Sequence, residues 1–231
     1  MDYSSHSSPA KGQHDRKAGV AYVVDDDESV RLALDGLLRS IGVRVETFES
    51  TQEFLAFPKH EAPSCLILDV RLRGESGLTF QEQMSRIGVR MPIVFMTGHG
   101  DIAMSVKAMK AGAVDFFAKP FRDQDMLDAV TSALARDDER IAAEQSSAAL
   151  RAAYESLTPR EKEVMRFVVA GLMNKQIAYE LNLSEVTVKI HRGQVMKKIG
   201  ARSVAELVRN AEMLNVAPEP VSPAKPMRDG A

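Results

Sequence analysis

The sequence predicts an α/β protein in which a doubly wound, five-stranded parallel sheet is followed by a small all-α domain. Two observations support this fold class. Between residues 19 and 135, five short apolar segments alternate with five amphipathic ones, a pattern that requires crossover helices and a parallel sheet. From residue 154 to residue 214, apolar residues recur at helical spacing and very short turns separate the segments.

The composition has the balance of a soluble globular protein. The chain has 231 residues, of which 45% are hydrophobic and 27% are charged, and its formal net charge is -2. The single cysteine, Cys65, excludes an internal disulfide, and no apolar run is long enough to span a bilayer. Residues 1–18 lack the apolar segment of a secretory signal, so we expect a disordered leader on a cytoplasmic protein with no membrane partner.

The first two strands are expected at residues 20–24 and 43–48. The first is an apolar run that leads directly into acidic residues, and the second alternates apolar with polar residues, as a half-exposed edge strand does. Between them, residues 29–41 carry apolar side chains at helical spacing, which predicts a helix. Ser50 has the spacing of a capping-box residue and predicts a short helix that ends before Pro58.

The third strand, residues 65–69, is the segment around which the domain is organised. Four apolar residues run directly into Asp69, and a short run of this kind is typical of a strand buried on both faces. A buried strand has no structural reason to end in a charge, so Asp69 is a candidate functional residue. Residues 71–77 are expected to form a loop, and residues 78–87 a helix.

The last two strands are expected at residues 92–96 and 114–118, with helices after them at residues 101–111 and 123–135. Residues 136–153 are charged and alanine-rich and contain no glycine or proline, which predicts a helical linker. An apolar residue at every seventh position also leaves a coiled-coil dimer open, although only one of the two seam positions is apolar.

Residues 154–214 are expected to form a bundle of four short helices. Thr158, Pro159 and Glu161 have the spacing of an N-cap, a first-turn proline and a capping-box partner. The four helices are expected at residues 158–170, 174–181, 185–199 and 203–214. Residues 215–231 hold four prolines and no periodicity, which predicts a disordered tail.

Polar side chains stand at the carboxyl ends of four predicted strands. They are Asp25 and Asp26 after the first strand, Asp69 on the third, Thr97 after the fourth and Lys119 after the fifth. Any one of them alone would be an ordinary cap, turn or surface residue, but parallel strands bring all of them to one edge of the sheet. Three carboxylates repel one another unless a cation lies among them, and Mg²⁺ takes oxygen ligands and bridges to phosphate. These groups are suited to phosphoryl transfer onto Asp69.

Residues 20–135 resemble the receiver domain of two-component response regulators, which has a flavodoxin-like fold. The matching motifs are Val24-Asp25-Asp26, Leu68-Asp69, Met96-Thr97-Gly98 and Lys119-Pro120-Phe121. The resemblance implies that a histidine kinase phosphorylates Asp69. It implies a Mg²⁺ or Mn²⁺ ion held by Asp25, Asp26, Asp69 and the backbone carbonyl of Arg71. It also implies phosphoryl contacts from Thr97 and Lys119, and an aromatic switch at Phe116.

The segment after Asp69 departs from the family pattern. Many receivers carry a proline soon after the phosphorylated aspartate, whereas this chain has Leu72-Arg73-Gly74. Arg71 and His99 stand two residues after Asp69 and Thr97. We hypothesise that their side chains hinder an attacking water and lengthen the phosphorylated lifetime, while the alternative of two ordinary surface side chains stays open.

The helix at residues 185–199 is the candidate DNA-reading element, because the second helix of a helix-turn-helix enters the major groove. Its inward stripe is expected to comprise Val186, Ile190, Val195 and Ile199. Four basic residues against one acid give it a local charge of +3, and residues 154–214 as a whole also carry a net +3. A solvated basic face is the alternative reading of this charge.

Residues 157–191 resemble the LuxR-type helix-turn-helix. The matching segments are Leu157–Glu161, Ala170-Gly171, Asn174–Ala178 and Thr187–His191. The order of receiver, linker and LuxR-type module resembles the NarL/FixJ class of response regulators, its FixJ-like members above all. The resemblance implies binding to double-stranded DNA through Lys175, Thr187, Lys189, Ile190, Arg192 and Lys197.

The two resemblances together imply a transcription factor switched by phosphorylation, and not an enzyme. Homodimerisation on phosphorylation, transcriptional activation and contact with RNA polymerase are the further expectations. Two alternatives stay open. One is a magnesium-dependent phosphohydrolase with an aspartate nucleophile, and the other is a regulator whose helical module binds proteins instead of DNA.

Overall fold

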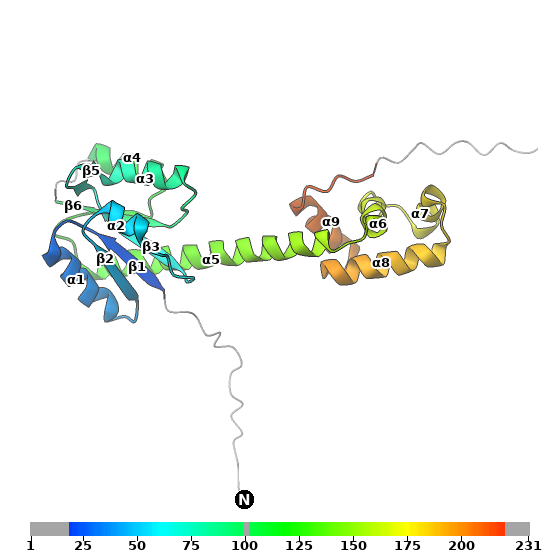
Figure 1. Ribbon diagram of the computed structural model, residues 1–231, viewed down its shortest axis with the longest axis horizontal. Helices are drawn as coiled ribbons and strands as arrows, with labels where there is room; N and C mark the ends of the chain where they lie inside the picture. Colours follow the sequence, from blue (N-terminus) through cyan, green and yellow to red (C-terminus); the bar gives the residue numbers. More distant parts are fainter. Residues whose placement is uncertain (1–18, 99–101, 220–231) are drawn as a thin grey trace, which may run out of the picture. The chain divides into compact units, whose positions relative to one another are not determined.

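The computed structural model describes residues 19–98 and 102–219, without the side chain of Glu75 (Figure 1). Its internal contacts divide the chain between Ile141 and Ala142 into two units, and each is described here by itself. Over the described part of the chain, no helix is both long enough and apolar enough to cross a membrane.

The first unit contains the predicted five-stranded parallel sheet. Its strands are β1 (Val20–Val24), β2 (Arg44–Phe48), β3 (Ser64–Asp69), β6 (Ile93–Thr97) and β7 (Asp115–Ala118). They pair in the order β2-β1-β3-β6-β7, which is a doubly wound topology. The strand ends differ from the predicted ones by at most one residue.

A small hairpin interrupts the segment that was predicted as a loop. The strands β4 (Arg71–Leu72) and β5 (Glu75–Ser76) pair antiparallel, and Gly74 between them has a φ of +87°. Glycine adopts this backbone conformation without strain, so the turn is placed where the sequence allows it. The two strands are too short for the alternation of side chains to have predicted them.

Helices cover both faces of the sheet. They are α1 (Glu28–Arg39), α2 (Thr51–Ala56), α3 (Gly77–Arg86), α4 (Ile102–Lys110) and α5 (Asp123–Glu155). Buried side chains of α2, α3 and α4 belong to one core cluster, and those of α1 and α5 belong to a second on the other face. Sheet and helices together confirm the predicted fold class.

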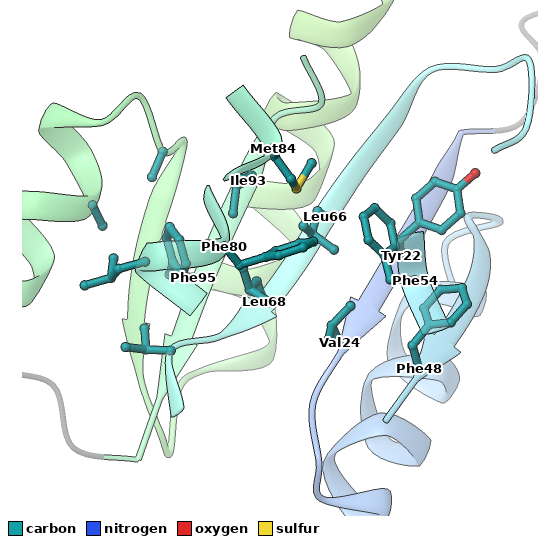
Figure 2. Close-up of a cluster of buried hydrophobic side chains, with 14 of the residues drawn as sticks. Tyr22, Val24, Phe48, Phe54, Leu66, Leu68, Phe80, Met84, Ile93 and Phe95 are labelled. Carbon is teal, nitrogen blue, oxygen red and sulfur yellow. The ribbon is translucent and has the colours of Figure 1, made fainter. Parts of the chain in front are cut away.

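The first of these clusters is rich in aromatic rings (Figure 2). Tyr22 from β1 packs edge-on against Phe54 of α2 with ring centroids 5.6 Å apart, and Phe80 of α3 lies 6.0 Å from the same ring. These rings are fully buried with Leu66 and Leu68 of the central strand β3, whose Cys65 and Ile67 are buried in the cluster on the other face. Burial of this kind on both faces fixes the position of β3, and therefore of Asp69 at its end.

The helix α5 continues without a break through the predicted linker. Its residues Met126 and Ala133 are buried in the first unit, as is Asp137. Leu150 and Ala153, near its other end, pack against the core of the second unit. The predicted helix at 123–135 and the predicted helical linker are therefore one element of 33 residues.

The second unit contains α6 (Pro159–Val169), α7 (Asn174–Leu181), α8 (Glu185–Ile199) and α9 (Val204–Met213). The predicted capping box is present at Thr158 and Glu161. Part of the segment predicted as a tail also contacts this unit, because Val216 packs against its core and Glu219 lies 3.6 Å from Arg166. The leader and the rest of the tail lie outside the described residues.

Candidate functional site

The candidate site lies where the order of strands in the sheet reverses. The chain passes from β1 to the edge strand β2, but from β3 it passes to β6 on the other side, and β1 and β3 are neighbours. Ligands bind in crevices at such points in open α/β sheets. A pocket of about 620 Å³ opens here, and its lining includes Asp25, Asp26, Asp69 and Lys119.

The carboxylates of Asp25, Asp26 and Asp69 are close enough to share one ion. One oxygen of each lies within 4.8 Å of the other two. Asp25 and Asp69 are buried and Asp26 is half-buried, and the main-chain N–H of Arg71 donates to Asp69 Oδ1 at 3.1 Å. Oxygen donors of this kind suit Mg²⁺, so the donor set fits the ion that the sequence predicts.

Lys119 joins two of these carboxylates. Its Nζ atom lies 2.6 Å from Asp25 Oδ2 and 3.0 Å from Asp69 Oδ2. Burial raises the pKa of Asp25 above its ordinary value, although hydrogen bonds from Lys119 and from the Asp27 N–H oppose the change. Burial alone would lower the pKa of Lys119, but its bonds to both carboxylates and their charges raise it. The pKa of Lys119 rises because two carboxylates contact it. The pKa of Asp25 rises because burial removes its hydration, and it shares its single lysine partner with Asp69.

Thr97 and Phe116 lie on adjacent strands beside the pocket. Thr97 ends β6 and is fully buried, and its carbonyl accepts a hydrogen bond from the Lys119 N–H at 2.7 Å. Phe116, in β7, is half-buried, and its ring centroid lies 6.4 Å from that of Phe95. His99, which the sequence places near the phosphoryl group, lies outside the described residues.

Two arginines at the pocket were missed by the sequence reasoning. Arg31 of α1 donates from Nη1 to the main-chain oxygen of Asp25 at 2.6 Å. Arg73 of the β4–β5 hairpin has its Nε atom 3.0 Å from Asp26 Oδ2. Nothing in the helical pattern distinguished Arg31, but Arg73 was visible as part of the departure from the family pattern after Asp69.

Gly77 is a further residue that the site requires. A Cβ atom at this position would lie 2.4 Å from the main-chain oxygen of Asp69, closer than any side chain can approach. The Gly77 N–H donates to Val70 O at 2.9 Å, so the first turn of α3 is held directly against the end of β3. The sequence placed Gly77 at the end of a loop, where its lack of a side chain had no evident reason.

The recognition-helix candidate α8 buries a different stripe from the predicted one. Val195 and Ile199 are buried as predicted, but the third buried residue is Val188. Val186 and Ile190 are 68% and 59% exposed, so their predicted inward position is wrong. The reason is geometric, because residues two apart on a helix point in nearly opposite directions and Val188 therefore turns Val186 and Ile190 outward.

The exposed face of α8 holds three of the residues predicted to bind DNA, which are Lys189, Ile190 and Lys197. Lys175 is exposed on α7. Thr187 is half-buried beside the helix N-cap, with its hydroxyl 2.8 Å from Ser184 Oγ. Arg192 is half-buried, and its Nη1 atom donates to Asn174 Oδ1 at 3.0 Å, so it also ties α8 to α7.

One of the basic residues of α8 has a structural partner. Lys198 Nζ lies 2.7 Å from Glu161 Oε2 and 3.4 Å from the main-chain oxygen of Ser156. The hydrogen bond from Lys198 lowers the pKa of Glu161, and the capping bond from the Thr158 N–H adds to this effect. Part of the charge of α8 is therefore used to hold the bundle together.

Two family models match the chain, and together they cover most of the described residues. Residues 21–131 match the response regulator receiver domain. Residues 155–211 match the bacterial regulatory proteins of the luxR family. The two matches fall on the sheet unit that holds the acidic pocket and on the helical unit.

Similar proteins match most of this chain over most of their own length. Nodulation protein W of Bradyrhizobium diazoefficiens is 52% identical over 198 residues, which are 86% of this chain and 87% of that protein. Response regulator protein TmoT of Ectopseudomonas mendocina is 49% identical over 195 residues, 84% of this chain and 89% of that protein.

Solved structures agree with these relatives. The low-resolution structure of response regulator StyR is 48% identical and matches with a TM-score of 0.77 over 85% of this chain and 99% of that chain. Full-length FixJ from B. japonicum is 38% identical, with a TM-score of 0.51 over 85% of this chain and 97% of that one. The chain therefore belongs to the response regulators, transcriptional regulators that join a receiver domain to a LuxR-type DNA-binding domain.

Proposed function

We propose that a histidine kinase phosphorylates Asp69, and that the phosphorylated protein binds double-stranded DNA through the helical unit. The observation that carries the proposal is the position of Asp69. Its carboxylate lies within 4.8 Å of two others and 3.0 Å from Lys119 Nζ, at the switch point of the sheet. A cap or a turn has no need for such a concentration of like charge, whereas phosphoryl transfer to a carboxylate does.

The reaction moves a phosphoryl group from a kinase histidine to Asp69. An Asp69 oxygen attacks phosphorus, and the electron pair of the broken phosphorus–nitrogen bond returns to the imidazole. A Mg²⁺ or Mn²⁺ ion would be held by Asp25, Asp26, Asp69 and the carbonyl of Arg71, and would supply positive charge for the phosphoryl oxygens. Lys119 donates to the same oxygens, and so does the hydroxyl of Thr97.

The conformational response passes through Thr97 and Phe116 to the surface formed by α4 and β7. Phe116 is only half-buried, so its ring has room to move when Thr97 turns toward the phosphoryl group. On α4, Ile102, Val106 and Met109 are exposed apolar residues at helical spacing. We propose that this surface, or the faces next to it, pairs with a second copy after phosphorylation.

The exposed face of α8 is proposed to enter the major groove. Lys189 and Ile190 face base edges, where an aliphatic side chain suits a thymine methyl group. Four further residues lie nearer the phosphates, where their contacts fix the position and orientation of the helix on the duplex. They are Thr187, Arg192, Lys175 and Lys197. We propose that the protein acts in the bacterial cytoplasm, where it contacts RNA polymerase and activates transcription.

Phosphorylation is tested with a small-molecule phosphodonor and Mg²⁺, read by intact mass on the wild type and on Asp69→Ala. We expect one added phosphoryl group on the wild type and none on the variant. DNA binding is tested by selection from a random duplex pool with the modified protein. An unmodified wild type, or modification of both proteins, would overturn the proposed site.

The two alternatives make different predictions in the same assays. A phosphohydrolase would turn over a phosphomonoester many times per protein, whereas a receiver retains one phosphoryl group on Asp69. A regulator that acts through protein contacts would enrich no sequence from the pool and would lose its DNA binding uniformly as the salt concentration rises. Enrichment of one sequence with a single added phosphoryl group supports the proposed function over both.

A further inference from the structure

Arg73 is held at the mouth of the acidic pocket by the β4–β5 hairpin. It stands in the segment where many receivers carry a proline, and Gly74 completes the turn. Its Nε atom lies 3.0 Å from Asp26 Oδ2, and its Nη1 atom lies 4.0 Å from Glu49 Oε1. The hairpin therefore brings a permanent positive charge to one of the three clustered carboxylates.

Every carboxylate of the cluster already contacts a positive side chain. Lys119 pairs with Asp25 and Asp69, and Arg73 pairs with Asp26. A divalent cation and a guanidinium both seek the oxygens of Asp26, and like charges cannot approach each other closely there. Binding of the ion must therefore weaken or break the pair between Arg73 and Asp26.

We propose that Arg73 is an internal counter-ion of Asp26 that competes with the divalent cation and lowers the metal affinity of the pocket. The inference rests on the proposed metal site and goes beyond it by assigning this role to a residue outside the ligand set. The side chain of Arg73 is 78% exposed, so it turns into solvent readily once displaced, with Glu49 as a second acidic partner nearby. Arg73 therefore tunes the affinity and does not block the site.

The size of the effect follows from the exposure of the pair. Ion pairs at this exposure stabilise by no more than about 1 kcal/mol, so removing Arg73 is expected to tighten metal binding about two- to fivefold. Because salt screens exposed charges, the difference between variant and wild type should shrink as ionic strength rises.

The experiment measures Mn²⁺ affinity of the full chain by electron paramagnetic resonance of the free ion, with Mg²⁺ as competitor. Arg71 supplies a matched control, since this residue lines the same pocket and forms no ion pair with any residue that the structure describes, and Arg71→Ala keeps the main-chain carbonyl that is proposed as a metal ligand. Arg73→Ala and Arg71→Ala remove the same charge, but only the first frees Asp26. Arg73→Lys restores a positive charge, and thermal melts confirm that all three variants fold.

The expected result is tighter Mn²⁺ binding by Arg73→Ala than by Arg71→Ala, with Arg73→Lys close to the wild type. Equal affinities in wild type and Arg73→Ala, weaker binding by Arg73→Ala, or the same gain from Arg71→Ala would each overturn the inference while leaving the metal site intact. If the wild type binds Mn²⁺ no better than Asp26→Asn does, the proposed metal site itself fails, and the inference fails with it.

Discussion

The buried charge of Asp25 opposes the stability of the metal-free protein. Burial raises its pKa in the folded state, whereas the unfolded chain has the ordinary value of 3.8. The folded state therefore binds this proton more tightly, and the contribution of Asp25 to stability falls as the pH rises from 3.8 through the folded pKa. The unfavourable effect is fully present once the pH exceeds the folded pKa.

Asp25→Asn is accordingly expected to stabilise the metal-free protein at pH 7 by about 0.5–2 kcal/mol, with the gain disappearing as the pH falls toward the ordinary pKa of Asp25. Chemical denaturation in chelator at several pH values measures this. Asp27 provides the opposite case, because a hydrogen bond from the Ser29 N–H lowers its pKa. Asp27→Asn should lose stability at neutral pH, and a gain from both substitutions would contradict the argument.

Gly77 allows a second test at the scale of one residue. Gly77→Ala places a methyl group against the main-chain oxygen of Asp69, so β3 or α3 must shift. We expect a loss of about 1–3 kcal/mol in unfolding free energy and slower phosphorylation of Asp69. The control is Gly36→Ala in α1, where a Cβ meets nothing within 4 Å, and it should stabilise the protein by about 0.5–1 kcal/mol.

At the scale of the element, α5 is tied to the start of the central strand. The side chain of Asp137 is buried, and it accepts a hydrogen bond from the Ser64 N–H at 2.8 Å while Arg140 lies 2.8 Å from its other oxygen. This carboxylate lies at the opposite end of β3 from Asp69. It therefore fixes where α5 leaves the sheet, and the sequence pattern gave no sign of it.

Asp137→Ala should be strongly destabilising because it removes the side-chain acceptor of the buried Ser64 N–H and one of the partners of Arg140. We expect a loss of about 2–4 kcal/mol in unfolding free energy, measured by urea denaturation of the full chain and read from the unfolding of the sheet unit. The neighbouring Asp138 is exposed, and Asp138→Ala should change stability by less than about 0.5 kcal/mol. Equal changes in stability from Asp137→Ala and Asp138→Ala would show that the buried hydrogen bond from the Ser64 N–H does not stabilise the fold.

Two lysines of α8 separate DNA binding from folding. Lys197 is exposed on the proposed DNA face, where it lies nearer the phosphates, whereas Lys198 is held by Glu161. Lys197→Ala should weaken DNA binding and reduce the slope of log affinity against log salt by about 1, without loss of stability. Lys198→Ala should destabilise the bundle and leave that slope unchanged. Binding titrations over a salt series, beside thermal melts, distinguish the two outcomes.

At the scale of the whole molecule, charge is divided between the two units. The chain carries -2 in total, yet residues 154–214 carry +3, so the acidic excess lies with the acidic pocket and the rest of the chain. Phosphorylation adds further negative charge to the acidic unit. Added negative charge does not attract DNA, so the charge itself does not account for the switch. The proposed switch depends instead on pairing of two copies, which doubles the DNA contacts and raises the local concentration of the second module.

This mechanism predicts that phosphodonor treatment converts the wild type from monomer to dimer in analytical ultracentrifugation, whereas Asp69→Ala stays monomeric. Affinity for a selected DNA site with two half-sites should rise with the dimer fraction. A phosphorylated monomer that binds this DNA as tightly as the dimer would rule out pairing as the basis of the switch.

The sequence predicted most of the fold and only part of the site. Apolar runs such as residues 65–69 predict buried strands, because burying apolar side chains is favourable wherever the fold allows it. No comparable pattern predicts which polar side chains contact one another, so the sequence reasoning missed Arg31 and Arg73 at the pocket. The prediction of the buried stripe of α8 was wrong for a related reason. Val186 and Ile190 are apolar, but the burial of Val188 determines which side of the helix faces inward.

The sequence by itself determined the order of elements, the parallel sheet, the acidic strand ends and the helix caps, because local periodicity and capping chemistry are written in neighbouring residues. Only the tertiary structure decided that Lys119 joins Asp25 to Asp69, that Arg73 reaches Asp26, and that Gly77 touches Asp69. Those contacts join residues far apart in the chain or across a turn. Their distances depend on how the whole sheet and its helices pack, which no local pattern records.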